Sequence, residues 1–328
     1  MNDNIRTICE NFITNRDAVK KAFSLESEHM YAASACTLTA AGVTADADSL
    51  KACKKALKKG TSVISNLRGM IEQSAAVRLY ISGEPEEYLR KTLACYDIIK
   101  KELGRSEYTS LLALFMADMT DESGAEQAAV KAKDIYKLMS KDHPFLTGSE
   151  DKVMAGFMAL TDKDSKTLCD EAENCYKLLK KRFSSSNTLQ TCSHVLAMAD
   201  GSAEEKVARV ARLYDLLKEP GRKYGKNTEL TALTALSLSD ADEKALVDTI
   251  CEIDGFLAEQ KGYGMLGFTK QSRLMHAAML TSAAYQHDTA LSDAASTATT
   301  VAMIAAVEMA MIAVVICTTT TTAAAASN

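Results

Sequence analysis

Polar and ionisable side chains are concentrated in one short segment, YKLMSKDHPFLTGSED at residues 136–151. It contains His143 and Asp151, together with the hydroxyl groups of Thr147 and Ser149. Histidine and carboxylate groups often hold a metal ion or exchange protons in catalysis. With His194 as a third donor, the segment could form the centre of a metal-dependent enzyme or sensor, although these residues follow no recognised metal-ligand spacing.

The same residues also fit a structural turn between two helices. Thr147 and Glu150 match a capping box, with Thr147 as the N-cap and Glu150 as the third helical residue. His143 suits the negative C-terminal end of the preceding helix, and Pro144 prevents that helix from continuing. The sequence therefore favours a rigid turn over an active site, and it assigns no catalytic residue here.

Other motifs do not supply a complete chemistry. The stretch from Gly262 to Gly267 matches the GxGxxG dinucleotide pattern, but that fingerprint works only after a strand, and a helical pattern precedes it here. We expect an interhelical loop with glycines at left-handed or close-contact positions. The patterns GxxxxGK[ST], HExxH and GxSxG do not occur, so no cofactor and no metal is assigned.

A repeat of about 40 residues organises the chain. A motif of tyrosine, one charged residue, two apolar residues and a segment with lysine recurs at Tyr96, Tyr136, Tyr176 and Tyr214. The second apolar residue of each unit extends the series to seven markers: Val19, Leu57, Ile99, Met139, Leu179, Leu217 and Leu257. Each marker is followed by a short loop and by a second apolar helix that carries an alanine: Ala33, Ala76, Ala113, Ala155, Ala197, Ala235 and Ala277.

The repeat predicts an all-α fold, a right-handed α-α superhelix of about seven helical hairpins of HEAT or armadillo length. Only 15 glycines and 3 prolines, with abundant Ala, Leu, Lys, Glu and Met, favour helix throughout. We expect a helical-repeat domain over residues 1–288. Residues 289–328 are expected to form a C-terminal capping helix and a low-complexity Thr/Ala tail.

The apolar segment VAMIAAVEMAMIAVVIC at 301–317 raises the question of a membrane span. As a helix it would be about 25 Å long, shorter than a bilayer core, and Glu308 lies at its middle. These features favour a capping helix over an anchor, and no membrane partner is predicted. Whether this segment packs on the repeats or on another chain stays open.

Charge and cysteine content restrict the partners and the compartment. The net charge is -5, which gives no overall attraction to nucleic acid. The nine cysteines form no CxxC pair, and the N-terminal residues lack the apolar core of a secretory signal. The prediction is a cytoplasmic protein with free thiols.

Basic residues gather at the end of the first helix of most units. They are Lys20, Lys21, Lys58, Lys59, Lys100, Lys101, Lys141, Lys180, Lys181, Arg182, Lys218 and Lys261. Cations at helix C-termini complement the helix dipole, and that structural role is sufficient. In a stacked array the same residues would also line one edge as a cationic ridge for an acidic partner.

Five stretches carry a resemblance to a known family: ISNLRGM (64–70), HPFLTGSEDKV (143–153), NTLQTCSHVLAMA (187–199), KYGKNTELTALTALSL (223–238) and QKGYGMLGFTKQSRLMHAAML (260–280). Over nearly its whole length the chain resembles the uncharacterised bacterial family called domain of unknown function 4003, in which phenylalanine is more usual at the position of Ile64. The resemblance implies a cytoplasmic bacterial protein and supplies no reaction.

The sequence therefore predicts an interaction module for an unknown protein or peptide, with an acidic partner as one possibility. The alternative is the metal-dependent enzyme or sensor around His143, Asp151 and His194. Most candidate binding residues are expected at or just after the loops that join the two helices of a unit, on one edge of the superhelix. The candidates are Arg68, His143, Phe145, Thr147, Asp151, Asn187, Gln190, His194 and Arg273.

Overall fold

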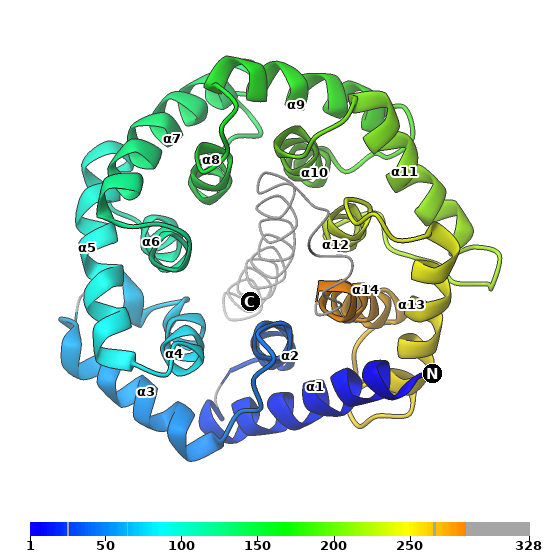
Figure 1. The fold of residues 1–328 in the computed structure, drawn as a ribbon, viewed down its shortest axis with the longest axis horizontal. Helices are drawn as coiled ribbons and strands as arrows, with labels where there is room; N and C mark the ends of the chain where they lie inside the picture. The colour runs from blue at the N-terminus through cyan, green and yellow to red at the C-terminus, as the bar shows by residue number, and fades with distance from the viewer. Residues whose placement is uncertain (25, 64, 265–266, 287–328) are drawn as a thin grey trace, which may run out of the picture. The chain divides into compact units, whose positions relative to one another are not determined.

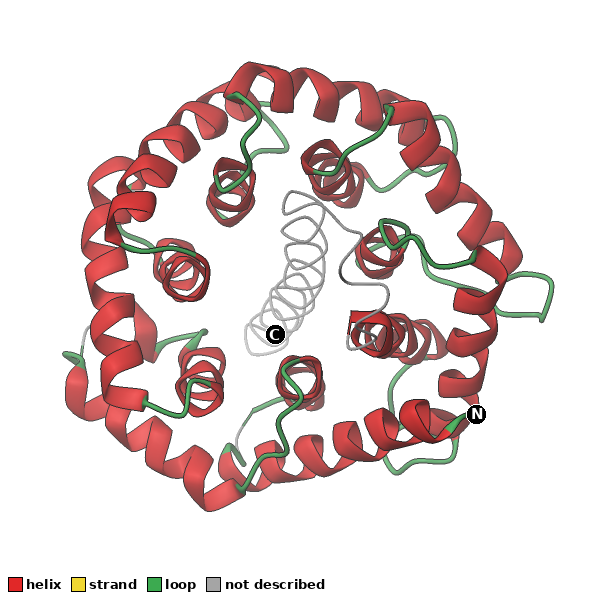
Figure 2. Ribbon diagram, in the orientation of Figure 1, coloured by secondary structure: helices red, strands yellow, loops and turns green. Residues whose placement is uncertain are grey.

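A computed structural model describes residues 1–24, 26–63, 65–264 and 267–286 (Figure 1). Within these ranges the chain forms fourteen α-helices and one 3-10 helix, and no strand (Figure 2). The all-α prediction is confirmed. The predicted capping helix and Thr/Ala tail at 289–328, including the apolar segment 301–317, lie outside the described residues.

The helices form consecutive pairs, as the repeat predicted. The pairs are α1 (Asp3–Ala22) with α2 (Glu28–Ala40), α3 (Ala47–Gly60) with α4 (Glu72–Ile81), α5 (Pro85–Leu103) with α6 (Glu107–Met119), α7 (Glu122–Asp142) with α8 (Asp151–Ala159), α9 (Ser165–Lys180) with α10 (Ser186–Met198), α11 (Ala203–Leu216) with α12 (Glu229–Leu236), and α13 (Glu243–Ala258) with α14 (Lys270–Gln286). The 3-10 helix η1 (Asn66–Arg68) lies between α3 and α4. The superhelical stacking of these pairs and its handedness stay predictions.

Helix starts follow from local side-chain chemistry. Nine residues that directly precede an α-helix accept a hydrogen bond from a backbone N–H of its first turn: Asn2, Ser27, Asp46, Ser106, Asp121, Asp164, Ser202, Asp242 and Thr269. Ser202 and Glu205 form a complete capping box at α11. Pro85 occupies the first position of α5, where a missing N–H costs nothing. Each cap satisfies a donor that the helix itself leaves unpaired.

The repeat markers form the core of each hairpin. All seven predicted apolar markers are buried, and so are six of the seven predicted alanines. The exception is Ala33, which is half-buried, while its neighbour Ala32 is fully buried. The predicted buried positions are therefore confirmed for the marker of every hairpin. In α2 the fully buried alanine lies one residue earlier than predicted.

The chain divides into two compact units. Unit A comprises Thr14–Cys169, and unit B comprises Met1–Ile13 together with the described residues from Asp170 onward. In unit A, α3, α5 and α7 contact one another in sequence, and α2, α4, α6 and α8 do the same in a second layer (Figure 1). In unit B, α11 contacts α13, and α10, α12 and α14 are likewise neighbours. Each unit is thus a two-layer array of hairpins.

The two layers differ in their exposure. Helices such as α3 and α9 carry charged residues along one side and bury the other. In contrast, α6 buries an unbroken run from Thr109 to Ala117, and α12 is buried from Leu230 to Leu236. These two even-numbered helices are therefore buried on every side over most of their length, as expected for helices that are hydrophobic all round.

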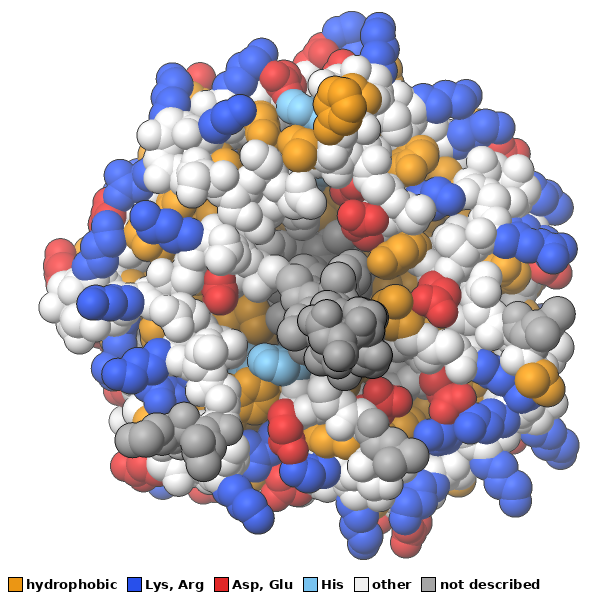
Figure 3. All heavy atoms as spheres, turned by 180° about the vertical axis from the view of Figure 1, so that it is seen from behind, with side chains coloured by type: hydrophobic (Ala, Val, Ile, Leu, Met, Phe, Trp, Pro, Cys, Tyr) orange, Lys and Arg blue, Asp and Glu red, His pale blue; other side chains and the backbone are white. Residues whose placement is uncertain are grey.

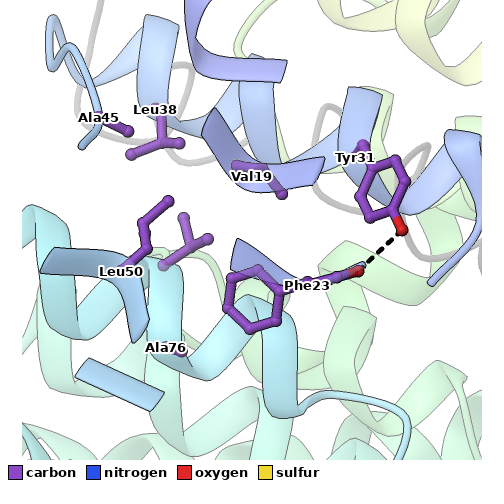
Figure 4. Packing of buried hydrophobic residues seen from close by; sticks show 8 residues of the cluster. Val19, Phe23, Tyr31, Leu38, Ala45, Leu50 and Ala76 are labelled. Atoms are coloured by element: carbon purple, nitrogen blue, oxygen red, sulfur yellow. Dashed lines mark hydrogen bonds between the residues drawn. The ribbon is translucent and has the colours of Figure 1, made fainter. Parts of the chain in front are cut away.

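A close view of unit A shows how successive hairpins share side chains (Figure 4). Val19 and Phe23 of the first hairpin pack with Leu50 and Ala76 of the second. The phenol of Tyr31 donates a hydrogen bond to the carbonyl of Phe23 at 2.7 Å, so its polar end is satisfied inside the cluster. Burial between hairpins is the physical reason that one hairpin alone would be unstable.

Candidate functional site

The loop between α7 and α8 is fixed by hydrogen bonds to the end of α7. His143 is the C-cap of α7, and its backbone N–H donates to the carbonyl of Met139 at 2.9 Å. The hydroxyl of Thr147 donates to the carbonyls of Met139 and His143 at 3.1 and 3.0 Å. Together with the backbone N–H groups of Leu146 and Thr147, which donate to the His143 carbonyl at 3.0 Å, these bonds tie the loop to the end of α7.

The predicted capping box of Thr147 and Glu150 is wrong. The N-cap of α8 is Glu150, its side chain makes no capping hydrogen bond, and α8 begins at Asp151. Thr147 lies against the end of α7 instead, because its hydroxyl donates to the Met139 and His143 carbonyls at that helix end. The prediction that His143 closes α7 before Pro144 is confirmed.

Asp151 is a buried carboxylate without an ion pair among the described residues. Its Oδ2 accepts a hydrogen bond from the N–H of Gly148 at 2.8 Å. Burial raises the pKa of Asp151 to about 7, and the nearby Glu150 charge acts in the same direction, while the Gly148 N–H opposes both. Tyr136 donates to the carbonyl of the same glycine at 3.2 Å, so the loop is held from two sides.

Phe145 stands out on this loop because its side chain is 99% exposed. The other large hydrophobic residues exposed in the described chain are Met1, Val63 and Val130, and all are less exposed. The hydrogen bonds of Thr147 and Gly148 hold the backbone close to Phe145. A fully exposed aromatic side chain on an ordered loop contributes little to the core and is suited to burial against a partner.

Arg68 has a structural role in the same unit. Its Nε donates to the hydroxyl of Thr61 at 2.9 Å, and its Nη2 donates to the carbonyls of Lys58 and Thr61. The guanidinium therefore caps the C-terminal end of α3. These bonds leave the side chain less suited to the binding role predicted from the sequence.

Three predicted site residues lie on α10 in unit B. Asn187 is exposed, whereas Gln190 and His194 are buried. Their positions, three and four residues apart, place them along one helix face. A partner at the surface would therefore meet Asn187 and would not reach the other two without a change in packing.

Arg273 belongs to a charge cluster that the sequence did not reveal. Its Nε donates to Oδ1 of Asp254 at 2.6 Å, and Nε of Arg222 lies 3.1 Å from Oδ2 of the same carboxylate. Asp254 is only 2% exposed and sits on the buried side of α13. A signal was present in the sequence, since a carboxylate on an apolar helix face requires a cationic partner.

The described residues of the glycine-rich stretch, 262–264 and 267, lie between α13 and α14 outside any helix, as predicted. Gly262 has a φ of 92°, and a Cβ on Gly267 would lie 1.8 Å from the carbonyl oxygen of Gly262. The loop is anchored by Tyr263, whose hydroxyl is 2.7 Å from Nδ1 of the buried His276. Phe268 packs edge-on against the same imidazole. The ring contacts and the Tyr263 hydrogen bond give His276 a structural role in the core.

Metal and thiol chemistry find little support in the described residues. No group of three or more His, Cys, Asp or Glu side chains there is arranged to hold a metal ion. The eight cysteines within the described ranges are free, and only Cys251 is partly exposed. Burial raises the pKa of Cys9 to about 12 and that of Cys192 to about 11, so both are neutral thiols.

The nine predicted site residues thus come from separate local networks. His143, Phe145, Thr147 and Asp151 belong to the α7–α8 loop or its border, and Arg68 caps α3. Arg273 pairs with Asp254, while the remaining three lie on α10. Among them, Phe145 is the side chain most available to a partner.

Residues 15–310 match the family described as "Protein of unknown function (DUF4003)". The chain belongs to this family. The DUF4003 match begins within α1 and includes every later helix, so the fold described above is the fold of this DUF4003 chain. Searches of curated proteins and of solved structures gave no match.

None of the described helices of this DUF4003 protein is both long and apolar enough to span a bilayer. The family carries no assigned activity, so its membership adds no catalytic residue to the site.

Proposed function

We propose that this DUF4003 protein is a cytoplasmic bacterial protein- or peptide-interaction module that presents the α7–α8 loop to its partner. The observation that carries the proposal is the 99% exposure of Phe145 on a loop whose neighbouring residues are hydrogen-bonded in place. An ordered loop loses little conformational entropy on binding, so the burial of one aromatic ring contributes more to affinity. The free, largely buried thiols support a reducing compartment.

The test compares Phe145→Ala with Val130→Ala, a control that removes an exposed apolar side chain from the middle of α7. Each purified variant is used as bait in a lysate, and captured proteins are quantified by mass spectrometry. Phe145→Ala should lose the specific partner with an unchanged melting temperature, while Val130→Ala should keep it. Equal capture by the two variants would refute a binding role for this loop.

The rival function, a metal-dependent enzyme or sensor at His143, Asp151 and His194, has less support. The Asp151 carboxylate is buried and already accepts a hydrogen bond from Gly148, and His194 is buried on α10. Metal analysis of the purified protein separates the two functions. Stoichiometric zinc or manganese that is lost in His143→Ala would favour the rival.

A further inference from the structure

Two arginines from neighbouring hairpins of unit B share one buried carboxylate. Asp254 on α13 contacts Arg273, in the first turn of α14, and Arg222, in the loop 217–228 between α11 and α12. One carboxylate therefore faces two guanidinium groups, which leaves the cluster with one uncompensated positive charge. Asp254 holds the two arginines together and limits their rotation.

Arg222 keeps donors available for a ligand. Its Nε is buried beside Asp254, yet the side chain as a whole is 34% exposed. The guanidinium also shares a side-chain hydrogen bond with the thiol of Cys251 on α13, and its exposed part lies at the surface. A second two-arginine cluster in unit B differs, since Arg212 uses both Nε and Nη2 on Glu243 and Arg209 donates to the carbonyl of Ala241.

Three exposed lysines extend this charge: Lys223 and Lys226 in the loop 217–228, and Lys270 at the start of α14. None of the three forms an ion pair among the described residues, whereas Lys244 pairs with Asp248 on the surface of α13. In Figure 3, Lys and Arg side chains lie beside Asp and Glu side chains at several places on the surface. We call Arg222, Lys223, Lys226, Lys270 and Arg273 the cationic patch.

The position of the patch is unfavourable for folding. The first turn of α14 contains Lys270 and Arg273 and no acidic residue, although cations at a helix N-terminus oppose the helix dipole. The loop 217–228 contains four basic residues and one acidic residue, Glu219. Departures from local preference of this kind are concentrated at functional sites.

We propose that the cationic patch binds an acidic peptide segment, a run of aspartate or glutamate in a partner protein. Arginine side chains pair with carboxylates through two parallel hydrogen bonds, and the lysines add attraction over a longer range. The proposal rests on the interaction function and specifies the chemistry of the partner. Because it uses residues other than Phe145, its test can fail while the α7–α8 loop test succeeds.

Other polyanions fit the patch less well. Tyr214, Tyr224 and Tyr263 are buried, so the described part of these loops offers no aromatic surface on which nucleic-acid bases could stack. The large exposed hydrophobic residues of the described chain are Met1, Val63, Val130 and Phe145, and none belongs to the patch. The described part of the patch therefore offers no large apolar side chain that could insert into a lipid surface. A peptide requires neither feature.

The experiment measures fluorescence anisotropy of a labelled oligo-glutamate peptide titrated with the full-length protein at low ionic strength. The double variant Lys223→Glu/Lys226→Glu should weaken binding at least about tenfold. The control Lys137→Glu/Lys244→Glu makes the same change in net charge at exposed helical lysines and should weaken binding much less. Arg222→Gln should also weaken binding, with its melting temperature recorded to confirm folding.

Three outcomes would overturn the proposal. The first is no binding of the peptide by the unmodified protein, and the second is an equal loss in the patch and control variants. The third is tight binding of single-stranded RNA or phosphatidylserine vesicles through the patch with no binding of the peptide. Weaker peptide binding at higher salt is expected, because exposed charges are screened.

Discussion

Asp151 accepts a hydrogen bond from the backbone N–H of Gly148 at 2.8 Å, which ties the first residue of α8 to the loop before it. The carboxylate is buried and has no cation beside it among the described residues. Burial raises its pKa from 3.8 to about 7. The folded protein therefore holds this proton more tightly than the unfolded chain does, and the two states respond differently to pH.

The first prediction concerns this pH dependence. Since the folded pKa is raised, the contribution of Asp151 to stability is fully present below about pH 4 and is lost as the pH rises to about 7. Asp151→Asn keeps an acceptor for Gly148 and cannot ionise. It should have little effect at pH 3 and should stabilise the protein at pH 8, by up to roughly 4 kcal/mol.

Urea denaturation of both proteins at the two pH values measures the difference. Asp164→Asn is a suitable control, because hydrogen bonds from Thr167 lower the pKa of that exposed carboxyl. If Asp151→Asn changes the free energy of unfolding by the same amount at both pH values, the ionisation of Asp151 does not affect stability.

The second prediction tests the role of Thr147 at the end of α7. Thr147→Ala removes the hydroxyl hydrogen that the carbonyls of Met139 and His143 share and should cost about 1 kcal/mol of unfolding free energy. Thr147→Ser keeps the hydroxyl and should be nearly neutral. Thermal unfolding followed by circular dichroism provides the comparison. Equal losses in both variants would point to the methyl group rather than to the hydroxyl.

The hairpin architecture could be predicted from the sequence because its signal is local and repeated. A buried marker such as Leu57 or Ile99 recurs at nearly constant intervals, and each lies on a helix that is amphipathic over its own length. The motif tyrosines also have repeated contacts: Lys100 lies over Tyr96, and Lys180 lies over Tyr176. Periodicity reports burial, so the core was the easiest part to predict.

The loops were harder to predict because one residue can serve either of two adjacent helices. Thr147 is equally suited to begin α8 or to end α7, and the position of the Met139 and His143 carbonyls decides between them. Arg273 and Arg222 meet at Asp254 across 19 and 32 residues of sequence, and no local pattern records that contact. The site therefore depends on long-range packing that the repeat alone does not specify.

The third prediction tests the close approach of α6 and α8 in unit A. A Cβ on Gly156 would lie 2.2 Å from Cδ1 of the fully buried Leu112. Gly156→Ala should therefore destabilise the protein by about 1–3 kcal/mol through overpacking. In the double variant Gly156→Ala/Leu112→Ala the added methyl group finds space, so the two losses should not add. Additive losses, measured by urea denaturation, would exclude a direct contact.

The fourth prediction compares two glycines of the last hairpin with opposite surroundings. A Cβ on Gly267 would lie 1.8 Å from the carbonyl oxygen of Gly262, and this obstacle is backbone that also accepts a hydrogen bond from Phe268 at 2.9 Å. Gly255 is exposed in the last turn of α13, and a Cβ there would meet nothing within 4 Å. Gly267→Ala should therefore destabilise the protein, while Gly255→Ala should stabilise it by about 0.5–1 kcal/mol, because alanine has the higher helix propensity. Thermal unfolding of both variants measures the pair, and a neutral Gly267→Ala would show that the loop relaxes without loss of the Tyr263–His276 contact.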